Sequence, residues 1–587
     1  MRNSGSMRLI NIKAFLERER VMSTGGRPDR RAKVLEFCGD ETTTYVILSH
    51  RWINGTEVEY EDMVDLARMD VDERDEIRKR LGYKKILDIC KQAKGDGYDW
   101  VWVDTCCIDK RSSAELSEAI NSMYRWYENS MVCYAYLHDV SDPFFPTESD
   151  ESRYPDSNGW PEWFSRGWTL QEMIAPRNVL FFNTDWQHIG DKRMLVNTLY
   201  RITRVPRPIL KDGLSGNRPC IAQIMSWAAN RTTTRVEDKA YSLMGLLDVN
   251  MPMLYGEGKK AFHRLQLEII RTSNDQSIFA WGRHSKNVRT GSILADDPSL
   301  FEGCSRMELI NPKEFIDVLR DSLYLSAEEL PSINQDHFGV FPITNRGIHI
   351  WLFLRPHRDF DSVFEAWLPC RYGRWVPPVT INLALWNSNH YRYSSLLRYR
   401  TEQPLQFRQV YLRYQDTYHD VTFDIDDGGI TEKGFTYCGG YPQNLVGNTF
   451  TLTAASPLCV RTYCNGQARF AVECGRYLGQ DWVHIVNNPP SELLASDKDE
   501  MLVRGFKRAQ SIANTPSRAD PHDRIWVNYT CPLGSTWIVR TYRVVWERSK
   551  IGVRLEIFHN PGVYDGLGQW RNLVVEVGGL FVVRTYH

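Results

Sequence analysis

Two apolar runs that end in polar and aromatic residues decide the fold, Tyr45-Val-Ile-Leu-Ser-His-Arg-Trp52 and Trp100-Val-Trp-Val-Asp-Thr-Cys-Cys107. Short apolar runs of this kind are typical of strands that are buried on both faces of a parallel sheet. Between them, apolar residues recur at helical spacing over 84–94, and the pattern ends at Gly95 and Gly97. The sequence therefore predicts a strand, a helix and a second strand, in this order.

The same alternation continues as far as residue 182. Ser112-x-x-Glu115 has the spacing of a capping box and opens a predicted helix, which is followed by a strand over 131–137. Residues 142–159, rich in Pro, Ser and Asp, are interpreted as a loop before a helix over 163–174 and a strand over 179–182. Strands that alternate with helices imply right-handed crossovers. We therefore predict an α/β fold with a mainly parallel sheet and flanking helices.

A β-rich pattern replaces this alternation beyond about residue 290. Residues 219–272 are still predicted to be helical, but the later runs are rich in β-branched and aromatic residues and turn at Gly, Pro or Asn. The predicted strands cover 348–354, 379–385, 409–413, 482–486, 537–546, 553–558 and 573–577. We expect an all-β, sandwich-like region and divide the chain into residues 7–285 and 286–587. The six residues before Met7 are interpreted as a tag remnant and are excluded.

The composition excludes several classes of protein. Lys and Arg number 72 against 73 Asp and Glu, so the net charge of −1 does not favour binding to nucleic acid. No run approaches the roughly 18–20 apolar residues of a membrane helix, so we expect no membrane span. The 13 cysteines include no Cys-x-x-Cys pair, and no signal peptide is recognised. We therefore expect free thiols, no metal site and a cytoplasmic location. The charged run over 57–80 is interpreted as a solvated surface.

Polar and aromatic side chains follow the predicted strands at one edge of the sheet, where ligands bind in open parallel sheets. The candidates after the strands are Ser49, His50, Arg51, Trp52, Asp104, Cys107, His138 and Asp139, and the predicted helix over 163–174 adds Arg166, Trp168 and Glu172. Cationic groups, carboxylates and indole rings at one edge suit a ligand that has aromatic and sugar parts.

Three blocks of the sequence resemble the signature blocks of the fungal heterokaryon-incompatibility (HET) domain. They are Tyr45–Trp52, Trp102-Val-Asp-Thr-Cys-Cys-Ile-Asp109 and Ser165-Arg-Gly-Trp-Thr-Leu-Gln-Glu172. The commoner family forms are LSYxWG, WIDxxCINQ and RxWTxQE, and this sequence departs from them at His50, Ile53 and Asp109-Lys110. The resemblance covers about residues 40–285 and does not extend to the C-terminal half.

The HET domain in turn resembles a divergent TIR domain, the flavodoxin-like module of immune signalling. Val46-Ile-Leu-Ser-His50 is similar to the first TIR strand, Gly97–Asp104 to the second, and Trp168-Thr-Leu-Gln-Glu172 to the motif W-C-x-x-E. In enzymatic TIR domains the Glu of that motif cleaves NAD⁺ between nicotinamide and ribose. The resemblance thus implies a TIR/flavodoxin-like fold and an NAD⁺ glycohydrolase with Glu172 as its catalytic residue.

The expected reaction needs one carboxylate and a well-positioned substrate. Departure of nicotinamide develops positive charge on the ribose, and a carboxylate at the ribose hydroxyls orients the sugar and stabilises that charge. Nicotinamide leaves as a neutral molecule, so no general acid is required, and NAD⁺ is a substrate rather than a cofactor. We expect substrate contacts from Ser49, His50, Arg51, Trp52, Asp104, Cys107, Arg166 and Trp168, with stacking from a Trp and pyrophosphate binding by an Arg.

Other functions stay open at this point. The domain is alternatively a non-enzymatic module for signalling and self-association, or a hydrolase with Cys106 or Cys107 as nucleophile beside a histidine. The resemblance also implies a homo-oligomer on activation and a role in fungal non-self recognition and regulated cell death. The β-rich half either packs on the first domain as an inhibitor or binds a protein partner or ligand.

Overall fold

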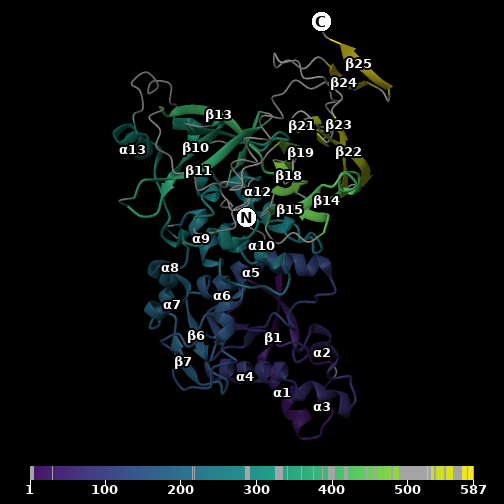
Figure 1. The fold of residues 1–587 in the computed structure, drawn as a ribbon. Helices are drawn as coiled ribbons and strands as arrows, with labels where there is room; N and C mark the ends of the chain where they lie inside the picture. The colour runs from purple at the N-terminus through teal and green to yellow at the C-terminus, as the bar shows by residue number, and fades with distance from the viewer. Residues whose placement is uncertain are drawn as a thin grey trace.

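The fold was obtained as a computed structural model (Figure 1). The described residues are 6–29, 31–214, 216, 218–283, 291–323, 335–339, 341–357, 360–374, 376–386, 388–393, 404–415, 421–442, 447–453, 458–466, 468–477, 480–487, 525–526, 530–533, 537–547, 550–559, 572–577 and 580–585. The first five residues and the predicted boundary between 285 and 286 lie outside these ranges.

The N-terminal part of the chain forms a seven-stranded sheet with the order β2-β1-β4-β3-β5-β6-β7. Its strands are β1 (Ser6–Asn11), β2 (Leu35–Gly39), β3 (Val46–His50), β4 (Trp100–Trp102), β5 (Val132–Tyr136), β6 (Val179–Phe182) and β7 (His188–Asp191). The four central strands, β4-β3-β5-β6, pair in parallel. β1 pairs antiparallel with β2 and β4, and β7 pairs antiparallel with β6. The prediction of a mainly parallel sheet is confirmed for the centre and wrong for the outer strands.

The first elements of the chain, β1, α1 and β2, were not predicted from the sequence. Ser6, which was excluded as part of a tag, is the first residue of β1. The apolar run of β1 is interrupted by Arg8, which hides the strand pattern. Arg8 is nevertheless buried, since its guanidinium forms an ion pair with Glu115 at 2.5 Å and donates to the carbonyl of Cys107 at 3.2 Å.

Helices cover the sheet, and those over 81–95, 113–129 and 169–174 lie where the sequence predicts helices. Their bounds are α1 (Ile12–Ser23), α2 (Tyr60–Asp65), α3 (Val71–Lys79), α4 (Leu81–Gly95), α5 (Ser113–Asn129), α6 (Thr169–Ile174), α7 (Val196–Thr203) and α8 (Arg207–Asp212). Ser112 caps α5 by accepting a hydrogen bond from the backbone N–H of Glu115. The predicted helix over 163–174 is wrong in one respect. It is a 3-10 helix, η2 (Glu162–Ser165), followed by α6, and the break lies at residues 166–168.

Short helices follow the sheet and connect it with the β-rich region. They are α9 (Ile221–Trp227), α10 (Asp238–Tyr241), α11 (Met244–Leu247) and α12 (Lys260–Thr272), and they lie within the stretch 219–272 that is predicted to be helical. In Figure 1 the purple and blue elements of the first sheet lie at one end, the green and yellow strands at the other, and α9, α10 and α12 between them. One buried hydrophobic cluster extends from Met7 to Leu412.

The described residues from 291 onward are rich in strands, as predicted. One sheet has the order β11-β12-β13-β9-β10-β8, two five-stranded sheets have the orders β16-β14-β23-β22-β21 and β15-β17-β18-β19-β20, and β24 pairs with β25. Side chains of both five-stranded sheets, such as Phe423 and Val472, share one buried cluster, as in a sandwich. Each predicted strand coincides with an observed one, but α13 (Pro312–Leu323) was not predicted.

The bounds of these strands are β8 (Glu308–Leu309), β9 (Ile348–His357), β10 (Phe360–Arg371), β11 (Pro378–Trp386), β12 (Asn389–Arg392), β13 (Gln406–Leu412), β14 (Val421–Asp426), β15 (Thr436–Tyr441), β16 (Thr449–Leu452), β17 (Leu458–Cys464), β18 (Arg469–Tyr477), β19 (Gln480–Asn487), β20 (Ile525–Trp526), β21 (Thr530–Leu533), β22 (Trp537–Glu547), β23 (Lys550–His559), β24 (Asn572–Val577) and β25 (Leu580–Thr585). A short helix, α14 (Gly428–Thr431), follows β14. Within the described ranges, none of the helices has the length and apolar content needed to span a bilayer.

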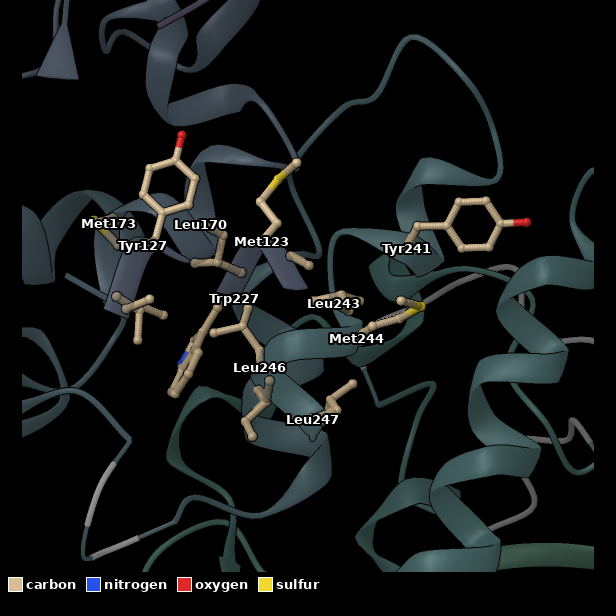
Figure 2. Close-up of a cluster of buried hydrophobic side chains, with 14 of the residues drawn as sticks. Met123, Tyr127, Leu170, Met173, Trp227, Tyr241, Leu243, Met244, Leu246 and Leu247 are labelled. Carbon is tan, nitrogen blue, oxygen red and sulfur yellow. The ribbon is translucent and has the colours of Figure 1, made fainter. Parts of the chain in front are cut away.

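Helix α6 is packed among α5, α9 and α11. Figure 2 shows Met123 and Tyr127 of α5, Leu170 of α6 and Trp227 of α9 in one buried cluster with the apolar residues of α11. The cluster leaves no room between α5 and α11 at Gly245. A Cβ atom at this position would lie 2.2 Å from the Cβ of Tyr124. Because a Cβ is fixed to the backbone, this contact is relieved only by a shift of a helix.

We therefore expect Gly245→Ala to destabilise the protein by about 1–3 kcal/mol, the usual cost of overpacking a core. Gly95→Ala is the matched control, because an added Cβ at this helical position meets nothing within 4 Å. Alanine also favours a helix over glycine by roughly 1 kcal/mol. Thermal unfolding of the two variants would show a lower melting temperature for Gly245→Ala only. An unchanged melting temperature for Gly245→Ala would contradict the packing described for α5 and α11.

Candidate functional site

The carboxyl group of Glu172 is buried where α6 meets the end of β3. The residue is 5% exposed. Ser49, near the end of β3, donates a hydrogen bond to Glu172 Oε2 at 2.5 Å, and Trp163 Nε1 donates to Ser49 Oγ at 2.8 Å. Trp163 belongs to η2 and is itself completely buried. The carboxyl is thus tied to the carboxyl-terminal edge of the parallel strands, as the sequence predicts for this residue.

Burial governs the ionisation of Glu172. It raises the pKa of this carboxyl to about 8, and the nearby charge of Asp104 acts in the same direction. The hydrogen bond from Ser49 and the positive charges of Arg231 and Arg166 lower the pKa but do not outweigh burial. At neutral pH the carboxyl is therefore mostly protonated and uncharged.

A second polar network lies around His50. Successive residues of a strand point to opposite faces, so His50 is directed away from the side of the sheet that Ser49 faces. Its Nε2 lies 3.5 Å from Glu57 Oε2, and its Nδ1 lies 3.9 Å from Asp104 Oδ1. Lys85 Nζ lies 2.5 Å from Glu57 Oε1. Burial works to raise the pKa of Glu57, but His50 and Lys85 together lower it to about 2.

Trp52 and Arg51 lie at the more exposed side of this network. Trp52 is 44% exposed, donates from Nε1 to Asp104 Oδ2 at 2.8 Å, and has Lys110 Nζ 4.0 Å from its ring. Arg51 forms an ion pair with Glu162 at 2.5 Å, and one of its Nη atoms lies 3.3 Å from His138. Both side chains thus have partners before any ligand binds.

The remaining predicted residues are distributed differently. Arg166 donates to Thr234 Oγ1 at 2.9 Å, and Trp168 forms a hydrogen bond with Asp238. Cys107 is buried in the core, where its Sγ accepts a hydrogen bond from the Val103 N–H, so it is not brought to Glu172.

The thiol alternative receives no support from this geometry. Cys106 donates to the carbonyl of Val103, and the contacts described for Cys106 and Cys107 do not include an imidazole. Burial raises the pKa of Cys106 well above its usual value, which opposes formation of a thiolate.

The structure adds residues that the sequence analysis missed. Arg231 donates to Thr169, in the same helix as Glu172, and its charge acts on that carboxyl. Glu57 lies near His50 and pairs with Lys85, and Glu162 pairs with Arg51. The interpretation of 57–80 as a solvated surface is wrong for Glu57, whose side chain is mostly covered, with 12% of it exposed. The sequence of the charged run 57–80 does not show that Glu57 has buried partners, because these partners lie outside the run. Within the described residues, no group of three His, Cys, Asp or Glu is arranged to hold a metal ion.

The raised pKa of Glu172 predicts a pH-dependent stability. Its folded pKa of about 8 lies above the ordinary value of 4.5, so the folded state binds a proton more strongly than the unfolded state. Stability is then greatest below pH 4.5 and is lost as the pH rises through 8. We expect Glu172→Gln to melt higher than the wild type at pH 8, by on the order of 3–5 kcal/mol in free energy of unfolding.

Glu57→Gln provides the control with the opposite sign. The pKa of Glu57 is lowered to about 2, so its stabilising effect is present at neutral pH and is lost only in acid. Removing this charge leaves buried Lys85 without its ion pair, and the variant should melt lower at pH 8. Thermal unfolding between pH 5 and 9 measures both effects, and a lower melting temperature for Glu172→Gln at pH 8 would count against the buried, neutral carboxyl.

Comparison with known proteins agrees with the sequence blocks. The family of heterokaryon incompatibility proteins (HET) matches residues 45–158, and a domain of unknown function (DUF8212) matches residues 260–300. The vegetative incompatibility protein HET-E-1 of Podospora anserina is 43% identical over 231 residues, which are 38% of this chain. The match covers only 16% of the length of that relative.

Solved structures of the Xerocomus chrysenteron lectin XCL also match part of the chain. The wild-type lectin is 12% identical over 24% of this chain and 99% of the lectin, with a TM-score of 0.16. A mutated form gives 12% identity over 24% of this chain and 97% of the lectin, with a TM-score of 0.17. These scores establish no common fold. The family match and the identity to HET-E-1 instead show that the N-terminal part of this chain, at residues 45–158, carries a heterokaryon-incompatibility (HET) domain.

Proposed function

We propose that this chain is an NAD⁺ glycohydrolase that acts in heterokaryon incompatibility, with Glu172 as its catalytic carboxylate. One observation carries the proposal: a buried carboxyl lies at the edge of the sheet where the parallel strands end, bonded to Ser49. Ligands of open α/β sheets bind at this edge. The incompatibility role is inferred from HET-E-1, whose name describes a vegetative incompatibility protein.

The fold is compatible with this reaction. The parallel centre β4-β3-β5-β6, with helices around it, is the arrangement expected for a TIR/flavodoxin-like domain, and the antiparallel outer strands are additions to it. Asp104 follows β4, Ser49 lies in β3, and Glu172 approaches from α6. These three residues therefore come together from separate elements in the way that an α/β ligand site is usually built.

The chemistry relies on the ionised form of Glu172. A carboxylate in a site of low dielectric stabilises the positive charge that develops on the ribose when nicotinamide leaves. The pKa of about 8 leaves only part of the protein ionised at neutral pH. The positive charge on the nicotinamide ring of NAD⁺ favours the ionised carboxylate as this ring approaches. We therefore expect the reaction to become faster as the pH rises from 6 to 8.

The reaction also requires access to Glu172. With 5% of the residue exposed and Trp163 bonded to Ser49, the carboxyl is closed off in this conformation. We propose that it represents a latent form, and that self-association moves η2 and Trp163 away from the carboxyl. Ser49 and Asp104 would then contact the ribose, and Trp52 would offer the exposed ring on which an aromatic part of the substrate stacks.

A second function is favoured by the same burial. A non-enzymatic signalling module would keep Glu172 as a structural side chain, buried and hydrogen-bonded to Ser49. In that case η2 need not move, and the sheet would act as an interaction surface.

Nicotinamide release from NAD⁺ distinguishes the two functions. The purified chain is incubated with NAD⁺ at rising protein concentrations and at pH 6, 7 and 8, and nicotinamide is followed by chromatography. We expect turnover that increases with protein concentration and with pH, and a loss of about 10²-fold or more in Glu172→Gln.

Glu19→Gln is the matched control for this substitution. Glu19 lies in α1, and its Oε2 accepts a hydrogen bond from the hydroxyl of Tyr83 at 2.7 Å, as Glu172 does from Ser49. This variant should retain wild-type turnover. Absence of turnover in the wild type at every concentration would favour the signalling module, and turnover that survives in Glu172→Gln would exclude Glu172 as the catalytic residue.

A further inference from the structure

The turn that precedes α6 is held by a segment far along the chain. Gly167 N–H donates to the carbonyl of Thr232 at 2.9 Å, and Thr232 N–H donates to the carbonyl of Ser165 at 2.7 Å. A Cβ atom at Gly167 would lie 2.6 Å from Thr233 Cγ2, so a larger residue here would displace the Thr233 side chain. This pairing explains why the predicted helix over 163–174 is interrupted before Thr169.

Arg231 extends this pairing into the interior. Its side chain is buried, and its Nη1 donates to the carbonyl of Arg166 at 2.7 Å and to Thr169 Oγ1 at 3.0 Å. Its Nε donates to the carbonyl of Trp227 at 3.2 Å. These three acceptors are neutral oxygens. The negative charge that acts on the buried guanidinium comes from Glu172, one turn further along α6.

We propose that Arg231 is the positioning residue for Glu172. Its guanidinium fixes the first residue of α6 and supplies a buried positive charge that favours the ionised form of Glu172. The positioning role stands on the contacts above. Its importance for NAD⁺ cleavage rests on the proposed function.

The surroundings of Glu172 make this charge important. The titratable and charged groups that face it are Asp104 after β4, Tyr127 of α5, Cys133 of β5, Arg166 before α6 and Arg231 after α9, while Ser49 of β3 donates the hydrogen bond. Of these, only the two arginines favour the ionised form through their charge. Arg166 is engaged with Thr234, whereas Arg231 is directed into the core beside α6.

The two buried groups depend on each other. Burial lowers the pKa of Arg231 to about 9, and the charge of Glu172 acts against that effect. Burial raises the pKa of Glu172 to about 8, and the charge of Arg231 acts against that effect. Because an isolated buried charge is costly, each group makes the charged form of the other less unfavourable. Loss of the charge at Arg231 should therefore raise the pKa of Glu172 further.

Arg231 lies in the segment of short helices between the sheet and the β-rich region. It follows α9, whose first N–H, that of Ile221, donates to Asp275 at 2.7 Å. The segment between the sheet and the β-rich region therefore contributes a residue to the candidate site. The position of α9 is thereby connected to the environment of Glu172.

Two substitutions separate the charge of Arg231 from its hydrogen bonds. Arg231→Lys retains a cation and a donor, whereas Arg231→Gln retains a donor and loses the charge. Arg392→Gln is the matched control, because Arg392 is also buried and donates to two backbone carbonyls, those of Phe279 and Trp281, without acting on Glu172. All three are made in the full chain.

The primary readout is the ionisation of Glu172 itself. Infrared difference spectra of ¹³C-glutamate-labelled protein, with Glu172→Gln subtracted, report the protonated carboxyl as a function of pH. We expect the midpoint to rise by about one pH unit in Arg231→Gln and to stay near the wild-type value in Arg231→Lys and Arg392→Gln. Where nicotinamide release is observed, Arg231→Gln should lower its rate about tenfold at pH 7. The midpoint of the pH–rate profile should also rise by about one pH unit.

Each result of the infrared titration supports or overturns the proposed role of Arg231. An unchanged midpoint in Arg231→Gln overturns it, and so does an equal rise in Arg392→Gln, which would reveal a general loss of packing. If Arg231→Gln does not fold, Arg231→Lys decides: a midpoint near the wild-type value supports the inference, and a rise of a full unit despite the retained charge overturns it. The infrared titration needs no turnover, so a shifted midpoint in a protein that does not cleave NAD⁺ would refute the proposed function alone.

Discussion

The hydrogen bond from Ser49 to Glu172 connects the central parallel sheet with the helix that carries the candidate site. It joins the buried carboxyl to a strand end, and Trp163 donates to the same hydroxyl. A serine hydroxyl has one proton to donate and two lone pairs to accept with. Ser49 uses the donor on Glu172 and an acceptor on Trp163, so β3, α6 and η2 are joined through a single side chain.

Helix α6 depends on residues from other parts of the chain. A helix of six residues has few internal hydrogen bonds and is unstable in isolation. Arg231 binds its first residue, and at its other end buried Lys192 donates to the carbonyls of Met173, at 3.2 Å, and Pro176. Burial lowers the pKa of Lys192 to about 8. Two buried cations from different segments thus fix both ends of the helix, which explains how so short an element can position a carboxyl.

Features set by neighbouring residues were predicted from the sequence, whereas features set by contacts between distant residues were not. Apolar runs such as Val179–Phe182 are local signals, and the strand observed there has the predicted bounds. The 3-10 helix and break before α6 were missed because their cause, pairing with Thr232, lies more than sixty residues away in sequence. β1 was missed because Glu115, the partner that permits Arg8 to be buried, is 107 residues away.

The same distinction applies to the candidate site. The placement of Ser49 and Glu172 at one sheet edge follows from strand order, so motif and topology were sufficient to predict it. The partners that set their charges were not predictable, because nothing near Arg231 or Lys85 in the sequence distinguishes a buried cation from a surface one. Cys107 was expected at the site because it follows a strand, but its side chain lies in the core.

The ionisation of Glu172 offers an argument about its role that does not depend on the family. With a folded pKa of about 8 and an ordinary value of 4.5, keeping this carboxyl buried and protonated at pH 7 costs about 3 kcal/mol. Glutamine would accept the same hydrogen bond from Ser49 without that cost. A purely structural role therefore gives no advantage to glutamate. Under the proposed function, opening of the site to water lets the carboxyl ionise and removes this cost. The ionised carboxyl is also the form that stabilises positive charge on the ribose.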